Sequence, residues 1–177
     1  MLKRNNLALF ALALLPMAAI AQTETPAMSQ TESANEHNSQ LAAIKQVMQQ
    51  YHEAVVTHNG TALSGLFLPE ANIWLNILTD SAYDRAKAKT PTTQKVRVGN
   101  YRDFAKIVST TTKSLDPEHS NLAIHTDGTI AAVYFDFVFK TDGIANNTGS
   151  ETWQLVKTVD GWRIAAICYS SNPPVQQ

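Results

Sequence analysis

Cysteine is nearly absent: Cys168 is the single one among 177 residues. One thiol cannot form an internal disulfide or a cysteine-rich metal site. A bond between subunits remains an alternative, but the apolar strand around Cys168 favours a buried, unreactive thiol.

An excess of positive charge is also absent. The chain carries 14 Lys and Arg against 15 Asp and Glu, a formal charge of −1. Nucleic-acid binders carry a basic patch or stripe, and no such stripe interleaved with aromatic residues occurs here. We therefore expect no nucleic-acid partner.

Motifs for cofactors and metals are missing as well. The sequence has no glycine-rich phosphate loop, no GxSxG nucleophile elbow and no HExxH pair. The five histidines show no metal-ligand spacing: His37, His52, His58, His119 and His125. We expect neither a metal nor a cofactor, and nucleophilic hydrolase and nucleotide-dependent mechanisms lose their usual support.

No hydrophobic run is long enough to span a bilayer, which takes about 20 apolar residues. The amino terminus has instead the order of an export signal: basic Lys3 and Arg4, an apolar run from Leu7 to Leu15, and the small-residue triplet Ala19-Ile20-Ala21. We predict cleavage after Ala21, a periplasmic or secreted location, and no stable membrane anchor thereafter.

The remaining chain is predicted to hold one domain. Residues 22–38 are polar, with almost no large apolar side chain, and are expected to form a flexible leader. Residues 39–171 form the domain, and 172–177 a loose tail.

Helices dominate the first part of this domain. Leu41, Ile44, Val47, Met48, Tyr51 and Val55 form one apolar stripe at helical spacing. Further elements follow: helices at 61–67 and 101–110, and strands at 71–78 and 94–98.

The last third predicts a meander. Asp-Gly pairs at 127–128, 142–143 and 160–161 separate runs of strand-forming residues. Such pairs are the strongest short-range hairpin signal. Strands are expected at 119–126, 129–141, 150–159 and 162–170, which makes the domain α+β.

This order resembles the nuclear transport factor 2-like superfamily. The resemblance rests on Val47-Met48-Gln49-Gln50-Tyr51-His52-Glu53-Ala54 with 66–71, and on Gly149-Ser150-Glu151-Thr152-Trp153 with the strand around Trp162. The SnoaL-like or lumazine-binding-like subgroup is the most similar. The resemblance implies a cone-shaped fold with three helices packed on a strongly curved, mostly antiparallel sheet.

A pocket between the concave sheet face and the helices is implied by the same resemblance, and so is a homodimer. The superfamily includes ketosteroid isomerase, scytalone dehydratase, limonene epoxide hydrolase, polyketide cyclases, and non-enzymatic binders and dimerisation modules. The fold alone does not select among these functions.

Asp136 is the conspicuous polar residue of an otherwise apolar strand, with Tyr134 on the same face. In one interpretation the surroundings raise the pKa of Asp136, which acts as a catalytic acid or base while Tyr134 bonds a substrate oxygen. In the other, this face is exposed or forms a dimer contact, and Asp136 is solvated or ion-paired.

His52, beside Tyr51 on the first helix, is a third catalytic candidate or a residue at the boundary of the core. Glu151 shares a strand face with Trp153 and either enters the pocket or pairs with Arg163 across the sheet. Arg97 is a candidate for binding an anionic ligand or for an ion pair with Asp136 or Glu151. The ligand-binding candidates are Tyr51, Trp74, Arg97, His125, Glu151 and Trp153.

The leading hypothesis is an exported domain that binds a small organic ligand. The first alternative is a cofactor-independent isomerase, dehydratase or cyclase that uses Asp136 with Tyr134 or His52. The second alternative is a structural dimerisation module. Whether the chain is an enzyme remains open at this stage.

Overall fold

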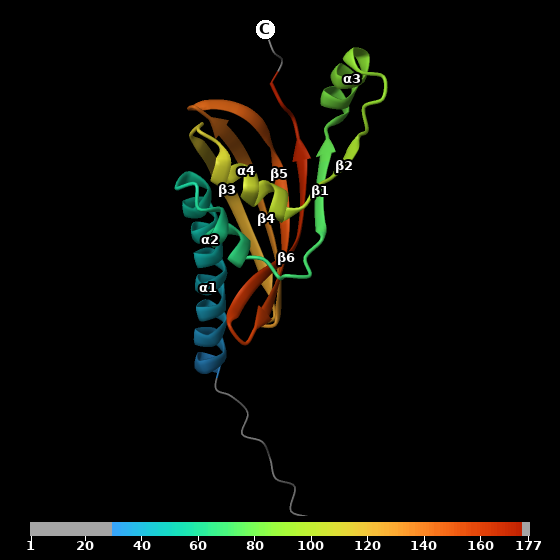
Figure 1. Ribbon diagram of the computed structural model, residues 1–177. Helices are drawn as coiled ribbons and strands as arrows, with labels where there is room; N and C mark the ends of the chain where they lie inside the picture. The colour runs from blue at the N-terminus through green and yellow to red at the C-terminus, as the bar shows by residue number, and fades with distance from the viewer. Residues whose placement is uncertain (1–29, 175–177) are drawn as a thin grey trace, which may run out of the picture.

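A computed structural model describes residues 30–174 (Figure 1). The predicted export signal lies outside the described residues, and so do residues 22–29 of the predicted leader. Four helices and six strands follow one another: α1 Gln30–Val56, α2 Gly60–Gly65, β1 Ile73–Leu78, α3 Asp80–Lys89, β2 Val96–Val98, α4 Tyr101–Thr110, β3 Leu115–Thr126, β4 Ile130–Thr141, β5 Ile144–Thr158 and β6 Gly161–Ser171.

The strands form one mixed sheet in the order β2-β1-β6-β5-β4-β3. All neighbouring pairs are antiparallel except β1 and β6, which run parallel. Three register shifts interrupt the long strands, at 120/123, 139/140 and 154/155. Bulges of this kind bend a strand and increase its twist, which accounts for the curvature seen in Figure 1. The α+β prediction with a curved, mostly antiparallel sheet is confirmed.

Helix α1 includes nine residues, 30–38, that the sequence assigned to the leader. The side chains at 31–38 are exposed, whereas the predicted stripe is buried from Ile44 to Val55. Once the packed part has nucleated the helix, each further residue adds a hydrogen bond at little cost, so the helix extends past its buried stripe.

A fourth helix, α3, was not predicted. Its sequence has no apolar stripe, and Ala82 is its one buried residue. The Thr79 side chain accepts a hydrogen bond from the Ala82 N–H, and this cap begins the helix. In Figure 1 α3 projects from one end of the domain, beyond the sheet.

The three Asp-Gly hairpins are confirmed, since each pair joins consecutive strands of the meander. Asp142 and Gly143 both have positive φ, 52° and 76°, as a tight hairpin turn requires. Strands β3 and β5 begin four and six residues earlier than predicted.

The predicted loose tail is fixed at its start. The Asn172 N–H donates to the Thr148 carbonyl at 2.9 Å, and Arg85 of α3 donates to the Pro173 carbonyl at 3.1 Å. These backbone contacts do not depend on side-chain hydrophobicity, so the polar composition of the tail gave no sign of them.

Helices α1, α2 and α4 cover one face of the sheet (Figure 1). The core lies between these layers and includes fully buried Trp153, Phe135 and Ile164. Alternation along β4 is as predicted: Ala131, Val133, Phe135 and Phe137 point into the core. Among residues 30–174, no helix has the length and apolar character needed to cross a membrane.

Candidate functional site

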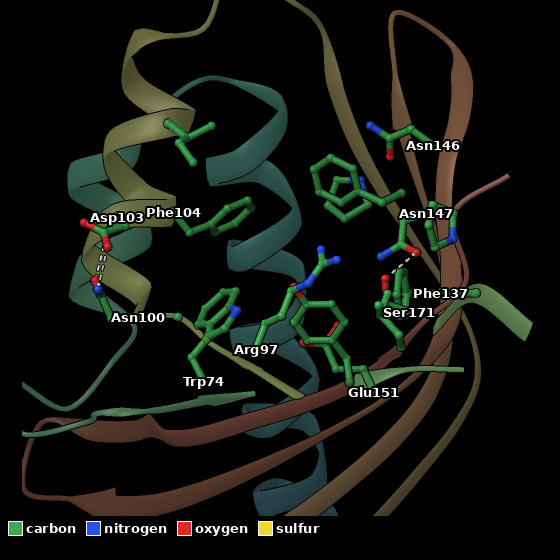
Figure 2. Close-up of a pocket in the computed structure, with 18 of the residues that line it drawn as sticks. Trp74, Arg97, Asn100, Asp103, Phe104, Phe137, Asn146, Asn147, Glu151 and Ser171 are labelled. Atoms are coloured by element: carbon green, nitrogen blue, oxygen red, sulfur yellow. Dashed lines mark hydrogen bonds between the residues drawn. The ribbon is translucent and has the colours of Figure 1, made fainter. Parts of the chain in front are cut away.

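A pocket of about 560 Å³ lies between the covered face of the sheet and helices α1, α3 and α4. Every strand contributes a side chain to it: Trp74, Arg97, His119, Phe137, Glu151 and Tyr169, from β1 to β6 in turn. The volume falls in the range typical of small-molecule sites. Figure 2 shows the pocket with its lining side chains.

Aromatic rings form much of the pocket wall. The Phe104 ring of α4 lies 5.4 Å from Trp74, 6.3 Å from Tyr51 and 6.2 Å from Phe139, measured between centroids. Gly99 leaves room for this arrangement, because a Cβ there would lie 3.1 Å from the Trp74 ring. The walls thus offer flat apolar surfaces to a ligand.

Glu151 is the buried carboxyl of the pocket. Its Oε1 atom accepts a hydrogen bond of 2.6 Å from the indole N–H of Trp153. Burial raises the pKa of Glu151 to about 7, although the bond from Trp153 acts in the opposite direction. The second carboxyl oxygen has no hydrogen-bond partner among the described residues and is available to a ligand.

Two further titratable side chains keep their neutral forms. Burial, with a smaller effect from His52, lowers the pKa of His119 to about 4, so its ring is uncharged at neutral pH. Burial also raises the pKa of Tyr51 well above its usual value, and the nearby Glu151 adds to the shift. At about pH 6, His119 and Tyr51 are therefore uncharged and Glu151 is mostly protonated.

Arg97 supplies positive charge to the pocket from the edge strand β2. Its strand neighbours Val96 and Val98 face the other side of the sheet, where they are exposed. Figure 2 shows the Arg97 side chain extending into the pocket. No acidic side chain within residues 30–174 forms an ion pair with it, so the predicted pairs with Asp136 and Glu151 are absent.

Four of the six ligand-binding candidates line the pocket: Tyr51, Trp74, Arg97 and Glu151. Trp153 is fully buried behind Glu151, whose carboxyl it holds. His125 lies elsewhere, on an exposed part of β3 where a shallow surface depression also includes His37. The alternative Glu151–Arg163 pair does not form, because the register of β5 and β6 places Glu151 opposite Tyr169 and Arg163 opposite Val156, five residues further along β5.

Asp136 and Tyr134 lie on the opposite face of the sheet from the pocket. Asp136 accepts hydrogen bonds from Asn121 Nδ2 at 2.8 Å and from Ser150 Oγ at 2.7 Å. These bonds lower its pKa, so the predicted upward shift is wrong. Tyr134 is 47% exposed. This is the arrangement of the second interpretation, an exposed face with the carboxylate paired.

His52 contacts the beginning of β3. Its Nδ1 lies 3.0 Å from the Pro117 carbonyl oxygen and 3.9 Å from the Asp116 carboxylate. It is half-buried and lies beside the pocket rather than in its lining.

Sequence reasoning missed His119, Tyr169, Phe104 and Asn147. Tyr169 follows buried Ile167 by two residues, and Phe104 belongs to the apolar stripe of α4, so both faces were predictable. Asn147 lies before the predicted start of β5, and His119 is the first residue of its predicted strand, so no alternating pattern indicated the face of either residue.

Among residues 30–174, no three His, Cys, Asp or Glu side chains gather in a way that could hold a metal ion. The Cys168 thiol is free and half-buried.

No family model matches the sequence, and no curated protein matches it either. Solved structures do match. A nuclear transport factor 2-like protein with a cystatin-like fold from Novosphingobium aromaticivorans shares 11% identity at a TM-score of 0.59, covering 83% of this chain and 91% of that one.

Two other matches carry provisional enzyme names. A protein from the same organism, named provisionally as a scytalone dehydratase, has 14% identity and a TM-score of 0.58, with 78% of this chain and 88% of that chain covered. A protein from Streptomyces avermitilis, named provisionally as a dehydratase of the nuclear transport factor 2-like family, has 15% identity and a TM-score of 0.58, with 78% and 99% covered. At these identities the matches establish the arrangement of the backbone, and by that arrangement the chain has the nuclear transport factor 2-like fold.

Proposed function

We propose that this chain is a small-ligand-binding domain that holds a flat organic molecule in the pocket between the sheet and α1, α3 and α4. The observation that carries the proposal is the pocket itself, about 560 Å³ in volume and walled by Tyr51, Trp74 and Phe104. A purely structural dimerisation module would need no such cavity. The order of the amino-terminal residues supports placing this binding in the periplasm or outside the cell.

A pocket-filling substitution tests the proposal. Ile107 lines the pocket and is 56% exposed, so Ile107→Trp adds volume there without crowding the core. Ile130 is 59% exposed and lies away from the pocket, which makes Ile130→Trp the matched control. Calorimetric titration with a set of small aromatic compounds should give binding to the wild type and to Ile130→Trp, and none to Ile107→Trp. Equal binding by all three proteins would contradict the proposal.

Acid–base catalysis in the same pocket is the second candidate, and Glu151 is the observation that favours it. A carboxyl with a pKa of about 7 exchanges protons readily at neutral pH, and one of its oxygens is open to a ligand. In this version of the enzyme hypothesis Glu151 takes the place given to Asp136. Exchange of a bound ligand's C–H protons with deuterium from solvent, lost in Glu151→Gln, would support catalysis beyond binding.

A homodimer is part of the proposal as well. The uncovered face of the sheet exposes Ile73 at 53%, Val98 at 77% and Tyr134 at 47%, a set of apolar side chains that a second copy can cover. Light scattering on the purified protein should give twice the monomer mass, and Val98→Glu should shift the mass toward one copy.

A further inference from the structure

Two donor groups of the pocket, on Arg97 and Asn147, have no hydrogen-bond partner among residues 30–174. The guanidinium of Arg97 has only donors, and this exposed side chain forms no ion pair with residues 30–174. A charged group left without a partner beside an apolar cavity is suited to a partner that arrives with the ligand.

Asn147 of β5 adds a second donor group. Its Oδ1 atom accepts hydrogen bonds from the Asn172 backbone N–H and from Ser171 Oγ, both at 3.0 Å. Because a backbone N–H can only donate, these bonds fix the orientation of the amide. The amide nitrogen then has no partner among the described residues, and Figure 2 shows it turned toward the side of the pocket where Arg97 lies.

The acidic groups of the lining do not offset these donors. The Asp103 carboxylate accepts a hydrogen bond of 2.6 Å from Asn100 Nδ2, and the Asp103 backbone N–H donates to Asn100 Oδ1 at 2.8 Å. Figure 2 shows this pair at the start of α4, away from Arg97. Glu151 is the other acid, and burial favours its neutral form below about pH 7. In Figure 2, Trp74 and Phe104 lie between Asp103 and Glu151.

We propose that the pocket selects flat aromatic molecules that carry a carboxylate, with the carboxylate bound by the Arg97 guanidinium and the Asn147 amide nitrogen. This inference rests on the proposed ligand-binding function and adds the chemical class of the ligand. A guanidinium presents parallel N–H groups that match the two oxygens of a carboxylate, while the aromatic rings contact the apolar part.

Two probes of the same shape test the carboxylate preference separately from ligand binding itself. 2-Naphthoate carries the carboxylate, and 2-naphthamide replaces it with an uncharged group of similar size. At about pH 6, where the naphthoate is ionised and Glu151 is mostly neutral, calorimetric titration should show the naphthoate binding about tenfold tighter, because hydrogen bonds to charged groups are the stronger ones.

Substitutions then assign the preference to residues. Arg97→Gln should remove it, with a much larger loss of affinity for naphthoate than for naphthamide, because the charge-assisted hydrogen bonds form only to the carboxylate. Asn147→Asp keeps both accepted hydrogen bonds and replaces the donor with a negative oxygen, so it should also weaken naphthoate binding selectively. Lys106→Gln removes one positive charge from an exposed position on α4 outside the pocket lining and should leave the preference intact.

The possible outcomes distinguish a failure of ligand binding from a failure of the carboxylate preference. If neither probe binds the wild type, the proposed binding function fails for flat aromatic ligands, and this inference fails with it. If both bind equally, the binding function stands and the carboxylate preference is wrong. A preference that persists in Arg97→Gln also overturns the inference, because the charge would then act from elsewhere.

Discussion

The Trp153 indole N–H donates a hydrogen bond of 2.6 Å to Glu151 Oε1, so a fully buried core residue orients the carboxyl that lines the pocket. The two side chains are two residues apart on β5 and share one strand face. Core packing and the chemistry of the pocket are therefore coupled through this bond.

Trp153→Phe should raise the pKa of Glu151 above its value of about 7, because the bond from the indole lowers that pKa in the wild type. A carbon-detected NMR titration of the Glu151 carboxyl in both proteins measures the two values. A wild-type carboxyl that titrates near 4.5 would contradict the burial argument.

Glu151→Gln should change the pH dependence of stability. Because the folded pKa of Glu151 is raised, the folded state binds its proton more tightly, and the wild type loses stability as pH rises from about 4.5 to about 7. At about 1.4 kcal/mol for each pH unit between the two pKa values, the loss is at most about 3.5 kcal/mol. The glutamine variant accepts the same indole bond and lacks this loss.

Chemical denaturation of wild type and Glu151→Gln across this pH range measures the difference in unfolding free energy. The comparison is needed because His119 acts oppositely: its lowered pKa makes stability fall as pH drops from about 6.5 to about 4. Tyr51, Tyr169 and Arg97 also line the pocket. Because these groups and His119 are present in both proteins, the difference between the two stability curves reports on Glu151. Parallel stability curves for the two proteins would show that Glu151 is not shifted.

Gly149→Ala should destabilise the fold by about 1–3 kcal/mol, because a Cβ there would lie 2.2 Å from the Ser170 carbonyl oxygen. Gly65→Ala is the control, since a Cβ at Gly65 meets nothing within 4 Å. Thermal unfolding should show a lower Tm for the first variant and little change for the second. Equal Tm values would mean that β5 and β6 are less closely packed at this point.

Asp136→Asn and Tyr134→Phe should leave the affinity for a pocket ligand unchanged to within about twofold, because both residues lie on the uncovered face of the sheet. Calorimetric titration with 2-naphthoate measures the affinity of both variants and of Glu151→Gln, whose substitution lies in the pocket. A large loss of affinity in either variant would restore the role that the sequence suggested for this pair.

The sequence predicted the fold well where hydrophobic periodicity and turn chemistry act locally. The stripe of α1 and the three Asp-Gly hairpins are of this kind. It missed α3, which has a single buried residue and so no stripe, and it placed the starts of β3 and β5 too late.

For the site, the sequence indicated the types of residue that line the pocket better than it indicated which face of the sheet each one occupies. Asp136 and Glu151 are both carboxylates on neighbouring strands with aromatic residues beside them. Which of them enters the pocket depends on the side of the sheet that α1 and α4 cover, and on the bulges that shift register between strands. Neither is encoded in the local pattern around either residue.

The most direct test of ligand binding in this pocket is an NMR measurement of contacts between bound 2-naphthoate and the protein. The account predicts nuclear Overhauser effects from the naphthalene protons to the Trp74 and Phe104 rings, which are neighbours in the pocket wall with centroids 5.4 Å apart. Contacts confined to the uncovered face, around Tyr134 and Val98, would contradict it.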